Sequence, residues 1–362
     1  MKKICLIFNH FRHQDGVGRS ALAVANILSR NKLAAVTLIP IYTDEKSFHN
    51  LLEPQVRVKH IFGFYFHGMP HIVDRLPLGW LNKMIKPQEY DIVVGFQFGI
   101  SIRCVASAKL DERIAKFAWM HGYDNGLTLR DEYERIGKVV CVSKCNAMRL
   151  RSELPTIVTD YSYNPIDEKT VQESGLQPSP VSKPINGPLL ITVGRLSPEK
   201  GFGRLIKVLK KIKDEGIAFT LWIVGEGPLD SDLHKLVHDL NLENDVLFLG
   251  RQNNPHKFTA KADLFVCSSY SEGYSTVCTE AIMLGVPVLS TNVSGAEEII
   301  EEAECGKVVG LDDESLYNGL SEVLQAPSVI DEWKNTLLTT RSRFYAGTRI
   351  QRLVNTLKLN ES

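Results

Sequence analysis

Short runs of apolar residues alternate with longer segments of helical periodicity along the first half of the chain. Short uninterrupted apolar runs are typical of strands buried on both faces, as in a parallel sheet covered by helices. Residues 20–29 and 100–108 show the helical pattern. The apolar runs are 4–8, 35–40, 91–96, 115–120 and 138–143. The first half therefore predicts an α/β domain with a parallel sheet.

The second half repeats this pattern more regularly. Between the halves, residues 166–188 are rich in Pro, Ser, Gly and Asn, which predicts a linker. We therefore expect two doubly wound, Rossmann-like domains, 1–165 and 189–335, that face each other across a cleft at the carboxyl ends of their strands. The apolar runs of the second half are 189–194, 219–225, 246–250, 263–268 and 286–291, and its helical segments are 203–214, 232–240 and 276–284.

Length and charge refine this picture. A chain of 362 residues is long enough for two hydrophobic cores. Basic and acidic residues number 42 each, and this balance argues against a nucleic-acid-binding protein. Residues 1–165 hold 22 basic and 15 acidic residues, which leaves 20 and 27 for the rest. The basic half predicts attraction to an anionic membrane or a phosphorylated acceptor, with ordinary surface variation as the alternative.

The cysteines and the N-terminus bear on localisation. The seven cysteines include no C-x-x-C pair and lie mostly among apolar residues, as reduced core thiols do. The first apolar run, 4–8, is too short for a signal sequence or a membrane span. We expect a cytoplasmic protein whose contact with the inner face of the cell membrane is peripheral.

Residues 59–86 combine aromatic side chains with scattered basic ones. One interpretation is a surface that contacts an acceptor or a membrane, with Trp80, Lys83 and Lys86 at the interface. The other is a core helix followed by an irregular loop.

Two glutamates eight positions apart mark the second half. Glu272 follows the run 263–268 in a polar loop, and Glu280 lies inside the helical segment 276–284. The first N–H groups of this helix, from about Gly273 to Val277, favour an anion between the two carboxylates. A diphosphate flanked by hydroxyl-bearing sugars suits this arrangement.

A second motif follows the run 189–194, which leads directly into Arg195-Leu196-Ser197-Pro198-Glu199-Lys200-Gly201. Arg195 then lies at the carboxyl end of a strand, and Lys200 lies just before a helix. Arginine can donate to two phosphate oxygens at once, and lysine supplies a compact charge. Such cations stabilise the charge that develops on a departing phosphate.

Both motifs resemble those of one enzyme family. The E-x7-E pattern from Glu272 to Glu280 and the GR-x-x-x-x-KG pattern around Lys200 resemble the retaining GT-B glycosyltransferases of family 4, also called glycosyltransferase group 1. The resemblance covers almost the whole chain and is strongest over 189–300. Asn164-Pro165, where many members have Asn-Gly, is more similar to the bacterial enzymes of capsule, lipopolysaccharide and exopolysaccharide synthesis.

The resemblance implies a GT-B fold in which the C-terminal segment 336–362 crosses back to the first domain. It implies retaining transfer of a hexose or N-acetylhexosamine from a UDP-sugar, with GDP- and ADP-sugars as alternatives, to a hydroxyl of a glycan or a lipid-linked acceptor. The catalytic residues implied are Arg195, Lys200, Glu272 and His121. The residues implied to bind the nucleotide-sugar are Gly16, Gly18, Gly225, Gly250, Arg251, Gly273, Tyr274, Ser275, Thr276, Val277 and Glu280, with Glu280 on the ribose.

A metal is not expected in this reaction. Asp230-Ser231-Asp232 spells the D-x-D triplet that binds metal in another glycosyltransferase fold, but here we expect it to cap the helix that follows. We expect no cofactor.

Two other functions are compatible with the motifs. A sugar-nucleotide epimerase of the same fold would need an acid and a base in the first domain, where Asp15 and Asp124 are the candidates. The other is a sugar-nucleotide-binding protein without catalysis, against which the intact Arg195, Lys200, Glu272 and His121 argue.

Overall fold

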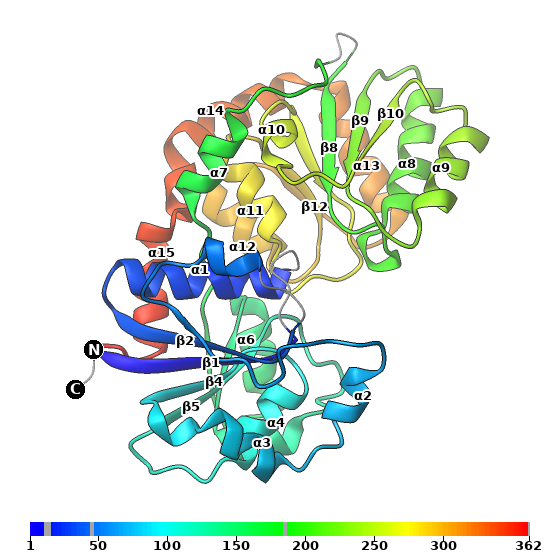
Figure 1. Cartoon of the computed structure of the whole chain (residues 1–362). Helices are drawn as coiled ribbons and strands as arrows, with labels where there is room; N and C mark the ends of the chain where they lie inside the picture. The colour runs from blue at the N-terminus through cyan, green and yellow to red at the C-terminus, as the bar shows by residue number, and fades with distance from the viewer. Residues whose placement is uncertain (11–15, 44–46, 184–186, 361–362) are drawn as a thin grey trace. The chain divides into compact units, whose positions relative to one another are not determined.

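The computed structural model describes residues 1–10, 16–43, 47–183 and 187–360. The chain divides into two compact units: Met1–Pro165 with Arg349–Ser362, and Ile166–Thr348. Each unit is built on one parallel β-sheet with helices on both of its faces (Figure 1). This architecture confirms the predicted fold of two Rossmann-like domains.

The sheet of unit 1 has seven strands in the order β3-β2-β1-β4-β5-β6-β7. In the central strand β1, Cys5 and Ile7 point to one face and Ile4, Leu6 and Phe8 to the other, and all five are buried. This burial on both faces explains the uninterrupted apolar run. The strands are β1 Lys2–His10, β2 Ala34–Tyr42, β3 Arg57–Val58, β4 Ile92–Gly95, β5 Ala115–Met120, β6 Lys138–Cys141 and β7 Val158–Tyr161.

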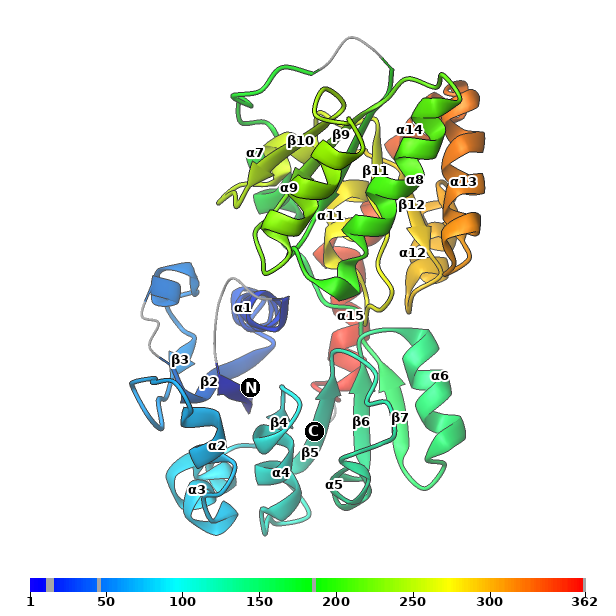
Figure 2. The same ribbon diagram turned by 90° about the vertical axis from the view of Figure 1, so that its right-hand side faces the viewer.

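Helices cover both faces of this sheet. Figures 1 and 2 show α1 (Gly16–Arg30) on the face opposite α3 (Leu78–Ile85) and α4 (Ile100–Ser107). The Cys5 face packs against α3, α4 and α5 through Leu81, Val105 and Tyr133. The remaining helical elements of unit 1 are η1 Ser47–Leu51, α2 Met69–Val73, η2 Pro87–Glu89, α5 Arg130–Ile136 and α6 Lys144–Glu153.

The sheet of unit 2 has six strands in the order β10-β9-β8-β11-β12-β13. Figure 1 shows α8, α9 and α13 on one face and α7, α10 and α11 on the other. The strands are β8 Leu189–Val193, β9 Thr220–Val224, β10 Val246–Gly250, β11 Leu264–Cys267, β12 Val288–Thr291 and β13 Lys307–Val309. The helices are α8 Phe202–Asp214, α9 Asp230–Asp239, α10 His256–Thr259, α11 Thr276–Met283, α12 Ala296–Ala303, α13 Asp313–Gln325 and α14 Ser328–Thr340, and η3 is Pro198–Lys200.

The predicted linker 166–188 differs from the structure. It contains a helix, α7 (Glu168–Gly175), which begins at the N-cap Asp167 and belongs to unit 2. Glu168 Oε2 accepts from the N–H of Ala346, and Gln172 Nε2 donates to Tyr345 Oη at 2.6 Å. Val171 is the buried residue of this helix. One buried position is too few to produce an apolar periodicity, so the sequence pattern did not reveal the helix.

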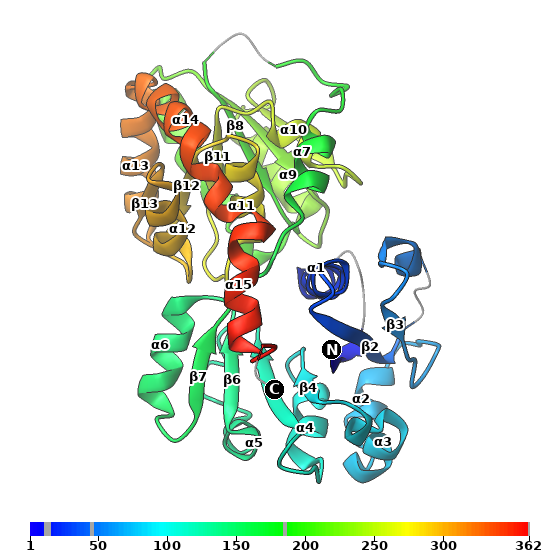
Figure 3. The same ribbon diagram turned by 90° about the vertical axis from the view of Figure 1, so that its left-hand side faces the viewer.

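The C-terminal segment returns to unit 1, as the resemblance implied. After α14 and η4 (Arg341–Phe344), helix α15 (Ala346–Thr356) reaches β7 (Figure 3). Arg352 Nε donates to the carbonyl of Tyr161 at 2.9 Å, and Thr356 Oγ1 donates to Asp160 Oδ2 at 2.9 Å. The division between the units falls after Thr348, inside α15, whereas the predicted boundary before residue 336 falls inside α14.

The strand order reverses at one place in each sheet. In unit 1 the reversal lies between β1 and β4, and in unit 2 between β8 and β11. The loops after the two strands of such a pair run in opposite directions and leave a crevice where open α/β sheets bind ligands. Functional residues are therefore expected at these two positions.

Candidate functional site

In unit 2, the turn after β8 lies against the turn after β9. The N–H of Leu196 donates to the carbonyl of Glu226 at 3.0 Å, and its own carbonyl accepts from Leu229 at 2.9 Å. Gly225 has φ +151°, and a Cβ there would lie 1.8 Å from the carbonyl oxygen of Gly194. Only glycine permits this approach of the two backbones. Gly225 therefore fixes the position of the turn that carries Arg195, whose side chain is exposed.

Lys200 ends η3, in the same turn, and is brought to Glu272 at the reversal point of the sheet. Gly201, the next residue, has φ +66°, and a Cβ there would lie 2.2 Å from the carbonyl oxygen of Ser268. The backbone of the turn after β8 thus touches that of the loop after β11. Lys200 Nζ is 2.7 Å from Glu272 Oε1. The structure therefore joins two predicted catalytic residues that are 72 positions apart in sequence.

This ion pair is largely buried, with 24% of the Lys200 side chain and 13% of the Glu272 side chain exposed. Burial acts to lower the pKa of Lys200, but the charge of Glu272 and the hydrogen bond to it prevail, and the pKa is raised. Lys200 is therefore a permanent cation. Ser269 Oγ also donates to Glu272 Oε1 at 2.7 Å, so both of these bonds end on one carboxylate oxygen and orient the group.

Arg204 holds the loop that carries Glu272. Its guanidinium is buried and donates to the carbonyls of Ser268, at 2.8 Å, and Ser269, at 2.7 Å. It also donates to the carbonyl of Leu311 and stacks on Tyr270, with 3.8 Å between the guanidinium carbon and the ring centroid. One side chain on α8 thus satisfies backbone groups of two loops.

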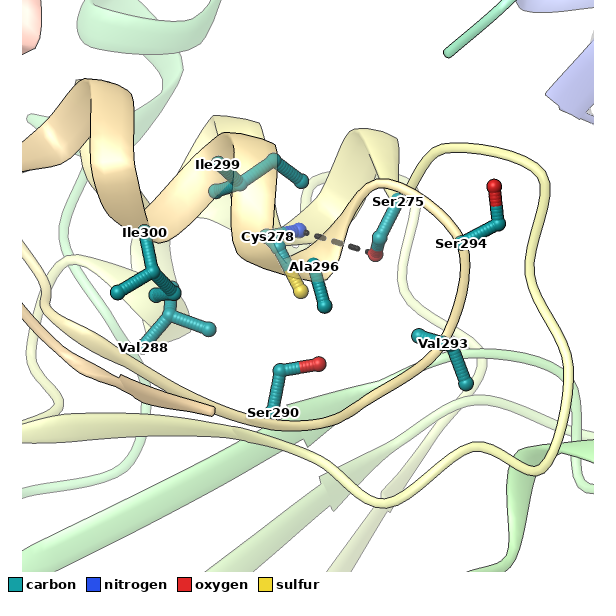
Figure 4. Close-up of a pocket in the computed structure, with 9 residues that line it drawn as sticks. All are labelled: Ser275, Cys278, Val288, Ser290, Val293, Ser294, Ala296, Ile299 and Ile300. Atoms are coloured by element: carbon teal, nitrogen blue, oxygen red, sulfur yellow. Dashed lines mark hydrogen bonds between the residues drawn. The ribbon is translucent and has the colours of Figure 1, made fainter. Parts of the chain in front are cut away.

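The loop ends at the start of α11. Ser275 is the N-cap, and its hydroxyl accepts from the N–H of Cys278 at 3.4 Å. Figure 4 shows this bond at the edge of a small, mostly apolar pocket between α11, β12 and α12. The N–H groups of Thr276 and Val277 are among those that an α-helix leaves without intrahelical partners, so they remain suited to an anion. Ser294 Oγ donates to the carbonyl of Gly273 at 2.9 Å and holds the other end of this segment.

Tyr274 and Glu280 are both buried. Tyr274 packs on Gly295, where a Cβ would lie 2.7 Å from the ring, so only its backbone is suited to a ligand. Glu280 lies on the inner side of α11, with 4% of its side chain exposed, and its Oε2 is 3.2 Å from Nε2 of His256 on α10. A histidine partner for the second glutamate was not predicted.

Gly225, Gly250 and Arg251, which were predicted to bind the nucleotide-sugar, lie at the ends of β9 and β10. The carbonyl of Gly250 accepts a hydrogen bond from the N–H of Gly225 at 2.9 Å. Gly250 therefore lies close to the turn after β8, which Gly225 contacts at Gly194. Arg251 Nη1 is 2.8 Å from Glu226 Oε1, and both side chains are substantially exposed.

The D-x-D triplet, Asp230-Ser231-Asp232, lies at the start of α9. Asp230 and Asp232 occupy the first turn of α9, and the N-cap is Leu229, so the predicted capping role is wrong, although acidic residues in a first turn still favour the helix dipole. Within the ranges that the structure describes, no group of three or more His, Cys, Asp or Glu side chains is placed to hold a metal ion.

In unit 1, the reversal point is a cavity of about 440 Å³. It lies among the residues that follow β1, β4 and β5, including Val17, Gln97, Phe98 and His121. His121 is half-buried in the wall of this cavity, and burial lowers the pKa of its imidazole to about 4, against the opposing effect of the hydrogen bond to the carbonyl of Phe96. Nε2 has no hydrogen-bond partner among the described residues. The neutral ring can therefore accept a hydrogen bond from a ligand hydroxyl at Nε2.

Other residues predicted in unit 1 have structural partners. Gly16 begins α1, and Gly18 is buried one position beyond Val17 of the cavity. Asp124 accepts from Thr128 Oγ1 at 2.8 Å and from the N–H of Leu129 at 3.1 Å, so its carboxylate holds the turn before α5. Because these hydrogen bonds occupy its carboxylate, Asp124 is a poor candidate for the catalytic base of an epimerase. Asp15, the other candidate, lies outside the described residues.

Comparison with known proteins identifies the domain that carries Lys200 and Glu272. Residues 177–336 match the family model described as glycosyl transferases group 1. The chain carries a group 1 glycosyltransferase domain. This match, which includes β8 to β13, lies within unit 2 and confirms the resemblance at the level of the family.

An N-acetylgalactosamine-N,N'-diacetylbacillosaminyl-diphospho-undecaprenol 4-alpha-N-acetylgalactosaminyltransferase of Campylobacter jejuni is 33% identical over 184 residues, 50% of this chain and 48% of that enzyme. The chain therefore matches about half the length of this relative. The lipopolysaccharide core biosynthesis glycosyltransferase LpsD of Rhizobium meliloti is 25% identical over 66% of this chain and 68% of its own. HepE of Anabaena, in complex with UDP and glucose, shares the fold, with a TM-score of 0.72, 20% identity, and coverage of 99% of this chain and 100% of HepE.

The group 1 domain contains two residues of the candidate site, Arg204 and His256, that were not predicted from the sequence. Arg204 holds the loop of Glu272, and His256 lies beside the side chain of Glu280. An arginine among apolar positions of an amphipathic helix was the available signal for Arg204, since arginine is buried only when paired. His256 follows Asn254-Pro255 at the start of α10, the shortest α-helix of the described residues, and no pattern linked it to α11.

Proposed function

We propose that this chain is a retaining glycosyltransferase that moves a hexose or N-acetylhexosamine from a UDP-sugar to a hydroxyl of a glycan or lipid-linked acceptor. The observation that carries this proposal is the Lys200–Glu272 pair, 2.7 Å apart at the reversal point of a parallel sheet and beside the capped start of α11. A fixed cation, an oriented carboxylate and unpaired helix N–H groups suit a sugar joined to a diphosphate.

In this mechanism, the bond between the sugar C1 and the phosphate oxygen breaks, and a bond from C1 to the acceptor oxygen forms on the same face. The acceptor proton passes to the departing phosphate. Lys200 and Arg195 stabilise the negative charge on that phosphate, together with the N–H groups of Thr276 and Val277. Glu272 accepts hydrogen bonds from hydroxyls of the transferred sugar, and Glu280 accepts hydrogen bonds from hydroxyls of the ribose.

His121 takes part as a neutral acceptor of a sugar hydroxyl. Its lowered pKa keeps the ring uncharged at neutral pH, and its unpartnered Nε2 lines the cavity of unit 1. A protonated imidazole would offer a donor there and could not accept the hydrogen bond.

The setting we propose is synthesis of cell-surface glycans. Two relatives support it: one acts on a diphospho-undecaprenol-linked sugar, and the other belongs to lipopolysaccharide core biosynthesis. The complex of HepE with UDP and glucose supports UDP as the nucleotide of the donor. GDP- and ADP-sugars are the alternatives.

The test combines donor binding with turnover. In a thermal-shift panel of UDP-, GDP- and ADP-sugars, we expect UDP-sugars to raise the unfolding midpoint most. With the donor so chosen and a glycan acceptor, Lys200→Ala should lower kcat about 100-fold or more, because it removes a charge that stabilises the leaving group. Lys207→Ala, at an exposed lysine on α8, the helix that follows Lys200, is the matched control.

Wild-type turnover in a folded Lys200→Ala protein would contradict the proposal. So would rapid formation of an epimer from a UDP-sugar without any acceptor, because that result would identify an epimerase. Retention is tested separately by NMR of the product, whose new glycosidic bond should keep the anomeric configuration of the donor.

A further inference from the structure

Two buried polar side chains of unit 2, His256 and Glu280, lie together on neighbouring helices. Their helices are α10 and α11, and α10 lies beside both α7 and α11 (Figure 1). His256 Nε2 is 3.2 Å from Glu280 Oε2, and 11% of the His256 side chain and 4% of the Glu280 side chain are exposed. A ring nitrogen and a carboxylate oxygen this close together can contact the same atom of a ligand.

The ring of His256 has a hydrogen-bonding group to spare. Nε2 is buried and makes no hydrogen bond within the ranges that the structure describes, although Glu280 Oε2 lies within hydrogen-bonding distance. Buried polar atoms nearly always have a hydrogen-bond partner, so an exception requires a reason such as an absent ligand. A histidine with a structural role alone is expected to direct its ring nitrogens to protein groups. The spare nitrogen beside Glu280 therefore indicates that the pair binds a ligand.

The residues around His256 fix its position. Phe258, two positions further on, is buried and packs edge to face on Trp222 of β9, with 6.1 Å between the ring centroids. Asn254, two positions before, donates from Nδ2 to the carbonyl of Ser174 in α7 at 2.9 Å. These contacts tie the single turn of α10 to the sheet and to α7. The imidazole is therefore held in place before a ligand binds.

We propose that His256 binds the ribose of the donor nucleotide together with Glu280, which rests on the proposed function. With its proton on Nε2, the imidazole donates a hydrogen bond to a ribose hydroxyl, and the same hydroxyl donates one to Glu280 Oε2. A hydrogen atom in place of that hydroxyl would leave both groups unused. The ribose is common to UDP, GDP and ADP, so His256 makes this contact whichever base the enzyme prefers.

The test is isothermal titration calorimetry of the full chain with UDP and with its 2′,3′-dideoxy analogue, which lacks both ribose hydroxyls. The wild type should bind UDP at least about tenfold more tightly than the analogue, because the analogue leaves a buried donor and a buried acceptor unpaired. His256→Phe should bind UDP about tenfold more weakly than the wild type does, and the analogue equally well. His256→Gln keeps a side-chain donor and should bind UDP within about threefold of the wild type.

A second background separates direct contact from an effect on Glu280. In a Glu280→Ala protein, adding His256→Phe should weaken UDP binding by a further factor of about three, because His256 contacts the ribose itself. His238→Phe changes an exposed histidine of α9 in the same unit, and this matched control should leave both affinities unchanged. Circular dichroism establishes that each variant is folded, and His256→Ala replaces His256→Phe if the latter is not.

The proposal is overturned if the folded His256→Phe protein weakens UDP and the analogue equally, or if it keeps the wild-type affinity for UDP. It is also overturned if His256→Phe has no further effect in the Glu280→Ala protein, because His256 then acts only by orienting Glu280.

Failure of the proposed function gives a different result. If the thermal-shift panel favours GDP or ADP, that nucleotide and its dideoxy analogue replace UDP in the titration. A wild type that binds none of the three nucleoside diphosphates contradicts the proposed function and the ribose contact together. A wild type that binds UDP and its analogue equally well overturns the ribose contact alone.

Discussion

At the scale of single residues, burial and partners decide the chemical state of the side chains of the candidate site. Lys200 and His121 are both largely removed from water, yet the pKa of Lys200 is raised and that of His121 is lowered. The difference is Glu272, which supplies a negative charge 2.7 Å from Lys200. His121 makes a hydrogen bond to the backbone carbonyl of Phe96, but no charged group lies beside it to offset its burial. One site therefore has a fixed cation and the other a neutral acceptor.

The burial of His121 predicts a pH dependence of stability. Its pKa falls from 6.5 to about 4 on folding, so between these values the unfolded chain binds more protons than the folded one. The corresponding stability is present above pH 6.5 and is lost as the pH falls to 4, by about 3 kcal/mol in total. Urea unfolding at a series of pH values should show this loss in the wild type and not in His121→Gln.

His67→Gln changes an exposed histidine in the same unit and should keep the wild-type pH dependence. If His121→Gln and the wild type lose the same free energy of unfolding between pH 7 and pH 4, His121 is not held in the neutral form by burial.

At the scale of elements, the strands were the easiest to predict, because each central strand is buried on both faces and its sequence is continuously apolar. Helix α7 was missed because Val171 alone is buried, and α10 because it is a single turn. In the candidate site, the positions of Glu272 before a helix and Glu280 inside it were predicted from the pattern. The contacts of Arg204 were not, because they join α8 to a loop 64 residues away.

The role of Arg204 leads to a prediction for α8 and the loop after β11. Arg204→Lys keeps the charge but cannot donate to several carbonyls at once or stack in the same way on Tyr270. We expect it to lower the free energy of unfolding by about 3 kcal/mol, since buried carbonyls lose their donors, and to lower kcat because the Glu272 loop is released.

Urea unfolding and turnover measure the two effects. Arg130→Lys, in an exposed ion pair with Glu134, should change stability by less than about 0.5 kcal/mol. An Arg204→Lys protein with wild-type stability and turnover would show that the loop holds its position without the guanidinium.

At the scale of the whole molecule, both units place their candidate residues where the strand order of a parallel sheet reverses. In unit 2, this brings together the residues after β8 and β11, and in unit 1 those after β1, β4 and β5. The charges in unit 2 that face the proposed diphosphate come from side chains and helix N–H groups. We propose that these groups stabilise the diphosphate without a metal ion.

We therefore expect the transferase activity to survive a chelator. After EDTA treatment and gel filtration, the rate with a UDP-sugar and acceptor should equal the untreated rate, because Lys200, Arg195 and the start of α11 supply the stabilising charge. Asp232→Asn should also keep the wild-type rate. Loss of activity that Mn²⁺ restores, together with an inactive Asp232→Asn protein, would show instead that the D-x-D triplet binds a required metal.

The sequence by itself determined the two α/β domains and the motifs of the candidate site, because apolar runs, glycines and charged residues at strand ends are local signals. It located Lys200 and Glu272 within their own segments. Only the tertiary structure decided that these two residues pair, that Arg204 holds the loop of Glu272, that His256 lies beside Glu280, and that His121 is neutral. Each of these depends on contacts between segments far apart in the chain, and on the burial those contacts create, which no local pattern records.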